Sequence, residues 1–192
     1  MFAYLEGELT YRSPSVLHMD VGGVGYEVNI TLQTYSKVQS LERCRLFMHL
    51  QVREDAWVLY GFAEEDERST FRALLAISGV GAATARIILS SLTPDELERA
   101  VAHEDSRTLE RVKGIGAKTA QRIILELKGK LLRSENTGAK PRVAHNTKED
   151  DALIALVNLG IGRSMAEAAL KKVHNAGELS VEELIKQALR SL

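Results

Sequence analysis

The sequence predicts a multidomain protein in which a β-domain is followed by two all-α domains. Short alternating or apolar runs fill residues 1–63, and apolar residues recur at helical spacing from residue 64 onward. Residues 134–149 lack either period and contain Ser, Asn, Gly and Pro, which is typical of a flexible linker. We therefore expect a barrel at 1–63, a helical domain at 64–133, a linker at 134–149 and a small three-helix domain at 150–192.

The first 63 residues predict five strands separated by turn-forming residues. A sheet of five short strands is best protected as a closed barrel, because closure leaves no free sheet edge. An OB-fold, the five-stranded Greek-key barrel, is the expected form. The predicted strands are 4–11, 16–21, 26–30, 45–52 and 57–62.

The middle of the chain predicts several helices. Phe71, Leu74 and Leu75 share one helical face, and Ile87, Ile88 and Leu92 share another. Thr93-Pro94-Asp95-Glu96 has the form of a capping box with proline at the first helical position. A short helical piece follows at 109–112, and a long amphipathic helix is predicted over 123–132.

The last 43 residues predict three short helices. The first covers 150–159 and ends at Gly160-Ile161-Gly162, and capping boxes that begin with Ser164 and Ser180 open the other two. A helical domain this small usually binds a partner. Leu159, Ile161 and Met165 are the apolar residues that we expect on its binding surface.

Composition excludes several classes of protein. A single cysteine, Cys44, permits neither an internal disulfide nor a cysteine zinc site. The five histidines show no ligand spacing, so no metal site is expected. No apolar run approaches the roughly 18–20 residues of a membrane helix, and the N-terminus lacks the basic start of a signal peptide. We expect a cytoplasmic protein with no membrane contact.

The net charge of −1 is unevenly distributed along the chain. Residues 1–66 carry −5, residues 71–133 carry +4 and residues 134–192 carry 0. The middle segment is therefore where a polyanion would bind.

An internal repeat lies within this basic segment. Residues 78–85 read Ser-Gly-Val-Gly-Ala-Ala-Thr-Ala, and residues 113–120 read Lys-Gly-Ile-Gly-Ala-Lys-Thr-Ala. Each copy is flanked by predicted helices. Paired glycines allow a tight hairpin, the apolar residue between them can anchor it in the core, and the next helix then presents free N–H groups to a phosphate. A glycine-stopped helix followed by another helix is the simpler interpretation of one copy, but not of two.

The candidate DNA-binding residues are those of the two hairpins and the helix starts that follow them. Lys118 adds a cation and the two threonines add hydroxyl donors. The full set is Gly79, Val80, Gly81, Ala82 and Thr84 in the first copy, and Gly114, Ile115, Gly116, Ala117, Lys118, Thr119 and Arg122 in the second.

The repeat resembles the helix-hairpin-helix motif of proteins that hold duplex DNA by its backbone, which gives binding without sequence readout. Together with the runs at 22–28, 53–56 and 59–62, it makes essentially all 192 residues similar to the RuvA family of bacterial Holliday-junction proteins. The resemblance implies a barrel that forms a homotetramer, with an octamer on DNA as the alternative. It also implies hairpins that bind four-way junction arms in recombination, DNA repair and the SOS response. Ala82 and Ala83 depart from the family, which often carries a basic residue there.

The same resemblance implies partners and a further site. The C-terminal domain is expected to bind a RuvB-type AAA+ ATPase for branch migration, and a RuvC-type resolvase is a possible further partner. Glu54 and Asp55 match an acidic pin at the junction centre, where carboxylates would repel phosphates and exclude continuous duplex. From the residues alone, a solvated turn or half a metal site are the rival interpretations of this pair.

No catalytic residues and no cofactor are expected. The glycines at 22–25 precede a strand rather than a helix, so they do not form a nucleotide loop. In the Gly116-Ala117-Lys118-Thr119 run the lysine does not directly follow the glycine, so it is no P-loop. Two other hypotheses remain open: a helix-hairpin-helix DNA-processing enzyme (glycosylase or nuclease), and a protein-interaction scaffold.

Overall fold

The computed structural model describes residues 2–136, 147–173 and 179–191. The chain divides into two compact units, Met1–Gly138 and Ala139–Leu192, which are treated separately below. No helix in the described ranges is both long and apolar enough to cross a membrane.

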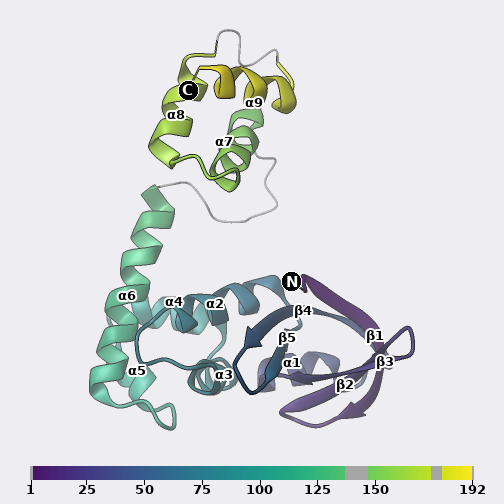
Figure 1. Ribbon diagram of the computed structural model, residues 1–192. Coiled ribbons are helices and arrows are strands. Elements are labelled where there is room, and N and C mark those ends of the chain that lie inside the picture. Colours follow the sequence, from purple (N-terminus) through teal and green to yellow (C-terminus); the bar gives the residue numbers. More distant parts are fainter. Residues whose placement is uncertain (1, 137–146, 174–178, 192) are drawn as a thin grey trace. The chain divides into compact units, whose positions relative to one another are not determined.

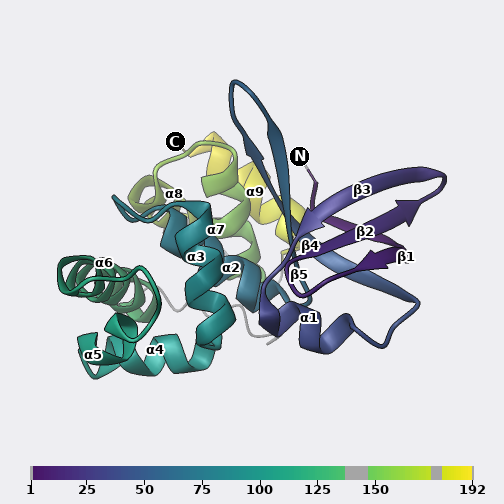
Figure 2. The same ribbon diagram turned by 90° about the horizontal axis from the view of Figure 1, so that it is seen from below.

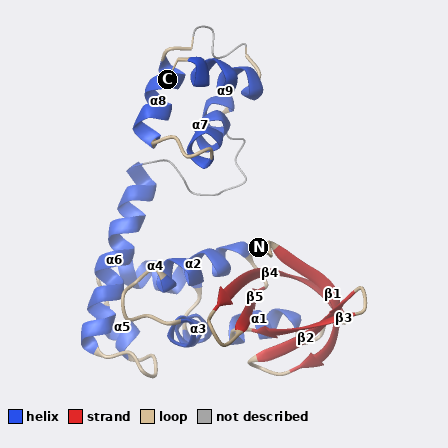
Figure 3. Cartoon of the chain, viewed as in Figure 1, coloured by secondary structure: helices blue, strands red, loops and turns tan. Residues whose placement is uncertain are grey.

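The first unit begins with a closed five-stranded barrel (Figure 3). Its strands are β1 (Tyr4–Arg12), β2 (Val16–Val21), β3 (Val24–Asn29), β4 (Arg43–Val52) and β5 (Trp57–Phe62), arranged in the order β1-β2-β3-β5-β4. All neighbours are antiparallel except β3 and β5, which pair in parallel where Val28 meets Leu59. Alternate side chains fill the interior, among them Leu5, Leu9, Leu17, Met19, Val28, Leu46 and Met48. The predicted barrel is confirmed.

A short helix that the sequence did not predict lies between β3 and β4. This helix, α1 (Leu32–Val38), begins at Thr31, whose hydroxyl accepts a hydrogen bond from Thr34 N at 3.0 Å. Thr31 and Thr34 are themselves buried. They contact Glu67 of the next helix, so α1 connects the barrel to the helical part of the unit.

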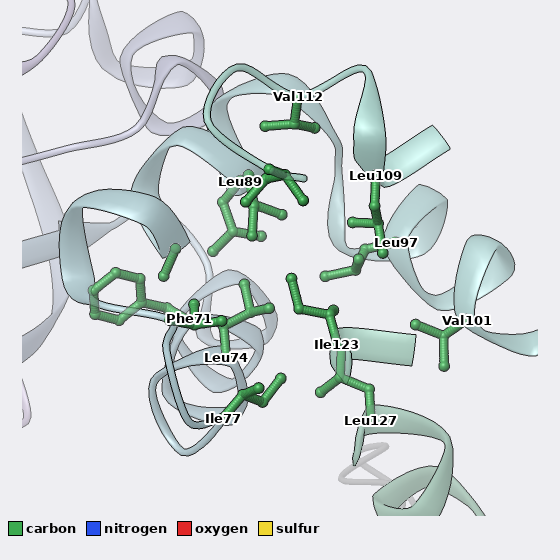
Figure 4. Close-up of a cluster of buried hydrophobic side chains, with 14 of the residues drawn as sticks. Phe71, Leu74, Ile77, Leu89, Leu97, Val101, Leu109, Val112, Ile123 and Leu127 are labelled. Carbon is green, nitrogen blue, oxygen red and sulfur yellow. The ribbon is translucent and has the colours of Figure 1, made fainter. Parts of the chain in front are cut away.

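Five helices follow the barrel within the same unit (Figure 1). They are α2 (Glu65–Leu75), α3 (Ala82–Ser91), α4 (Pro94–Ala102), α5 (Ser106–Glu110) and α6 (Ala117–Asn136). Their core gathers apolar residues from each of the five helices and from the turns between them (Figure 4). The labelled members are Phe71, Leu74, Ile77, Leu89, Leu97, Val101, Leu109, Val112, Ile123 and Leu127.

Two details of these helices differ from the sequence prediction. Ile87 is exposed instead of sharing the buried face of Ile88. Helix α6 begins six residues earlier than predicted and continues to Asn136, so it overlaps the start of the predicted linker 134–149. The remainder of that linker up to 146 lies outside the described residues, and the domain division stays a prediction. The capping box of Thr93 and Glu96 is confirmed.

The second unit consists of α7 (Lys148–Asn158), α8 (Arg163–Lys171) and α9 (Val181–Arg190). The buried apolar residues among its described ones are Ala152, Leu156, Ala166, Ala169, Leu184 and Ala188. The predicted capping box at Ser180 is confirmed, whereas the one predicted at Ser164 is wrong. The N-cap of α8 is Gly162, two residues earlier than predicted, so the Ser164 hydroxyl lies inside the first turn.

Candidate nucleic-acid interface

The two glycine hairpins have the same backbone conformation. Gly79 and Gly114 have φ values of 87° and 88°, in the left-handed region that glycine tolerates best. Val80 N donates to Ile77 O and Ile115 N donates to Val112 O, each at 3.0 Å. The sequence repeat is therefore also a structural repeat. The preceding turns match as well, with N–H to carbonyl bonds of 3.0 Å from Ile77 to Leu74 and from Val112 to Leu109.

The apolar residue at each hairpin tip anchors the hairpin in the core. Val80 and Ile115 are each only 5% exposed and belong to the helical core, as the sequence predicted. Ala82 is also buried. These three predicted site residues can therefore offer a ligand their main-chain groups, but not their side chains.

The starts of α3 and α6 present main-chain N–H groups. Ala85 N bonds to Gly81 O and Ala120 N bonds to Gly116 O, each at 2.9 Å, and these are the first bonds of the two helices. The amides before them have no acceptor within the helix. Gly81 has no side chain to cap α3, and a Cβ placed on Gly81 or Gly116 would meet open space. Both helix starts are thus accessible to an anion such as a phosphate.

The cations are concentrated at the second hairpin. Lys113 and Lys118 are exposed on either side of it, and the equivalent positions of the first hairpin are Ser78 and Ala83. Lys118 was among the predicted site residues, whereas Lys113 was not, although the repeat itself aligns Lys113 with Ser78. Ala117 is also exposed, whereas Thr84 and Thr119 are half-buried.

Two arginines near the hairpins make specific contacts. Arg122 of α6 donates from Nη1 to the carbonyl oxygen of Ser78 at 3.1 Å, which joins the second copy to the first. Arg86 of α3 donates to Asn29 Oδ1 at 2.6 Å and so attaches the first copy to strand β3. Arg122 was among the predicted site residues, whereas Arg86 was not.

The acidic pair occupies the tip of the β4–β5 hairpin, which extends from the barrel in Figure 2. Arg53 N donates to Ala56 O at 2.9 Å and closes the turn, leaving Glu54 and Asp55 exposed between them. Trp57, directly after the turn, is 75% exposed in the single chain, so it is no part of the barrel core. Within the described residues no group of three or more His, Cys, Asp or Glu side chains is arranged to hold a metal ion.

A buried carboxylate joins the barrel to the helix that leads to the first hairpin. Glu67 of α2 accepts hydrogen bonds from the hydroxyls of Thr31 and Thr34, the latter at 2.8 Å. Burial raises the pKa of Glu67 above its ordinary value, and the two hydroxyl donors oppose that shift. His49 of β4 contacts Phe71 of the same helix α2. Burial lowers the pKa of His49, and the charges of Arg72 and Arg68 lower it further.

The predicted partner surface of the second unit is partly accessible. Leu159 and Met165 are 65% and 56% exposed, whereas Ile161 is half-buried against the small core. Ile154 and Val157 of α7 are also exposed. Neither of these two was among the residues predicted for the partner surface.

These features define the class of the protein: an OB-like barrel followed by a tandem helix-hairpin-helix domain and a small helical domain. Residues 1–61 match the family model described as RuvA N terminal domain, and residues 147–192 match RuvA, C-terminal domain. Residues 71–130 match SAM-like Helix-hairpin-helix tandem.

Curated relatives extend over the whole chain. A protein of Cytophaga hutchinsonii is 43% identical with 99% of each chain covered, and one of Amoebophilus asiaticus is 45% identical with 99% of this chain and 100% of its own covered. One of Christiangramia forsetii is 44% identical with both chains fully covered. Each is named Holliday junction branch migration complex subunit RuvA. The chain described here belongs to the RuvA family.

Proposed function

We propose that this chain binds four-way DNA junctions as a non-catalytic homotetramer and recruits a RuvB-type AAA+ ATPase for branch migration in recombination and DNA repair. The observation that carries the proposal is the pair of hairpins with matching backbones, each followed by an accessible helix start. The names of the full-length relatives support it. Association with a RuvC-type resolvase, pairing of two tetramers into an octamer and a cytoplasmic location belong to the same proposal.

The hairpins would hold DNA through its phosphates. Gly79, Gly81, Gly114 and Gly116 let the sugar-phosphate backbone approach the amides that follow them, and Lys118 and Lys113 add charge. Phosphate contacts of this kind position a protein on DNA without reading bases. Preference for a junction must then come from how several hairpin pairs are arranged in the assembly.

The acidic turn would add to that preference at the junction centre. Glu54 and Asp55 are exposed at the end of a long hairpin, where two carboxylates repel phosphates. At the middle of a four-fold assembly they would disfavour continuous duplex and direct separated strands into the arms. The rival interpretation is a solvated turn without a role in binding.

The test of the main proposal compares binding to a four-way junction with binding to linear duplex of the same length. We expect the junction to bind at least about tenfold more tightly at moderate salt. Native mass spectrometry of the complex should show four or eight chains. Equal affinity for the two DNA forms would contradict the proposal.

The role of the acidic turn is tested by Glu54→Gln combined with Asp55→Asn. This variant should keep or increase its affinity for DNA while its preference for the junction over duplex falls. Glu8→Gln, which removes an exposed carboxylate on β1, serves as the control and should change neither. A clear loss of affinity in the double variant would contradict the pin.

Deleting residues 147–192 tests the proposal that the first unit binds DNA and the second recruits the ATPase. The first unit has its own core and should bind junctions as the full chain does. It should no longer stimulate the ATPase of a RuvB-type partner. Loss of junction binding would show that the second unit takes part in DNA binding.

The enzyme hypothesis has a direct test as well. A nuclease or glycosylase would cut a labelled junction or release a base, with or without Mg²⁺. Cleavage that Glu54→Ala abolishes would establish the enzyme, and we expect none. The family membership favours the non-catalytic role.

A further inference from the structure

One side chain connects the two hairpins directly. Arg122 is exposed on α6, the helix that begins at the second hairpin, and its Nη1 donates to the carbonyl oxygen of Ser78 in the first hairpin at 3.1 Å. A Cβ on Gly79 would lie 3.8 Å from the same nitrogen. The guanidinium therefore lies against the backbone of the first hairpin, 44 residues away in the chain.

The connection has no equivalent in the opposite direction. With the 35-residue offset of the repeat, Arg122 corresponds to Ile87 in α3, which is exposed but carries no hydrogen-bond donor. The first copy therefore cannot make the same contact to the second hairpin. Among the described residues, a polar side chain from the partner copy holds the first hairpin, and none holds the second.

We propose that Arg122 is a positioning residue for the first hairpin, so that both hairpins can hold phosphates of one duplex at the same time. This inference rests on the proposed function. The first hairpin lacks cations of its own and must rely on well-placed amides. Binding through such amides is tighter when their position is already set before the DNA arrives, because less ordering accompanies binding. The remaining guanidinium N–H groups can donate to a phosphate while Nη1 stays bonded to the Ser78 carbonyl oxygen.

The alternative is that Arg122 is an independent phosphate ligand of the second hairpin. The two roles predict different coupling to the first hairpin. An independent ligand loses the same factor in affinity whether or not the first hairpin is intact, whereas a positioning residue loses most of its effect once that hairpin is impaired. A double-mutant cycle with Gly81 separates them.

Gly81→Ala impairs the first hairpin without disturbing the fold. Its φ is −86°, which alanine adopts without strain, and the added methyl meets open space where a phosphate would approach. We expect Arg122→Ala to weaken junction binding by about tenfold in the wild-type background and by less than about threefold in the Gly81→Ala background. Equal factors in both backgrounds would overturn the proposal.

Lys118→Ala is the matched control, since Lys118 lies one helical turn earlier on α6 and is a cation that, within the described part of the chain, forms no hydrogen bond or ion pair with the first hairpin. Its effect on binding should be the same in both backgrounds. If Lys118→Ala shows the same coupling to Gly81→Ala as Arg122→Ala does, the coupling is general to the interface and the proposal fails.

A measurement without DNA tests the positioning itself. The amides of Val80 and Ile115 make equivalent bonds of 3.0 Å, so each serves as a reference for the other in hydrogen exchange. Arg122→Ala in the full chain should speed exchange in a peptide that contains Val80 by several-fold and leave Ile115 unchanged. Unchanged exchange at Val80 would overturn the inference. If the wild-type chain does not prefer junctions, the proposed function fails while this result remains valid.

Discussion

The two hairpins share one backbone and differ in their chemistry. Three exposed positions account for most of the difference: Ser78, Ala83 and Ile87 in the first copy are replaced by Lys113, Lys118 and Arg122 in the second. The hydrogen bonds that shape the hairpins are the same to within 0.1 Å, as the paired distances of 3.0 and 2.9 Å show. Charge therefore varies independently of geometry in this repeat.

The copies also differ in their attachment to the barrel. Around the first hairpin, Arg86 of α3 bonds directly to Asn29 of the barrel at 2.6 Å. Two further bonds reach α1, which connects to the barrel: Thr34 Oγ1 donates to Glu67 at 2.8 Å, and Leu32 N donates to Ser90 Oγ at 3.1 Å. The helices around the second hairpin pack chiefly on α2 and α4. The first hairpin is thus fixed and neutral, and the second is cationic and attached through other helices. Under the proposed function, the first hairpin would supply position and the second would supply electrostatic attraction.

The largest effect is expected from removing the charge of the second hairpin. Lys113→Ala with Lys118→Ala should weaken junction binding by about 10- to 100-fold and lower the salt slope of log K by about two, because two phosphate contacts are lost. Titrations at several salt concentrations measure both. The exposed pair Lys171→Ala and Lys172→Ala in the second unit is the control and should leave the slope as it is. An unchanged slope in the first variant would refute the assignment of charge to the second hairpin.

Adding the missing cation to the first hairpin should have a smaller, opposite effect. Ala83 is exposed in the first turn of α3, so Ala83→Lys should raise junction affinity several-fold and increase the salt slope by about one. A lysine near a helix start costs about 0.3–1 kcal/mol of stability. Ala168→Lys on α8 controls for charge alone. A gain of equal size from both variants would mean that the first hairpin does not lie on the DNA.

Detaching the first copy from the barrel should affect stability and leave the salt slope unchanged. Arg86→Ala removes the donor to Asn29 Oδ1 and should lower the free energy of unfolding by about 1–2 kcal/mol, as measured by urea denaturation. Because Arg86 is bonded to the barrel, no phosphate contact should be lost. A slope that falls by one would instead make Arg86 a DNA ligand.

The smallest effect is expected for the pH dependence of stability at Glu67, which attaches α2 to Thr31 and Thr34. The fold raises the pKa of Glu67, so the stability that its uncharged form contributes is complete below the ordinary value of 4.5 and is lost as pH rises through the raised value. Glu67→Gln cannot titrate at this position. The free energy of unfolding of the wild type minus that of the variant should therefore fall as pH rises from about 4 to 8 in urea titrations. A difference that grows with pH would contradict the direction of the shift.

Several elements could be predicted because their signals are local. Alternation over five short runs predicted the strands, and the Thr93 and Ser180 boxes marked the starts of two helices. Helix α1 was missed because seven residues with a polar face give too short a pattern to detect. The capping box predicted at Ser164 is wrong because α8 already has its N-cap at Gly162, two residues after Gly160, whose φ is 92°.

By itself, the sequence determined the order of the domains, the two glycine hairpins and the basic middle segment, because each depends on residues close together in the chain. Only the tertiary structure decided that Arg122 meets Ser78, that Arg86 meets Asn29 and that Glu67 is buried against Thr31. These contacts join residues 36 to 57 positions apart. They exist because the packing of the helices on one another and on the barrel brings those surfaces together, which no local pattern encodes.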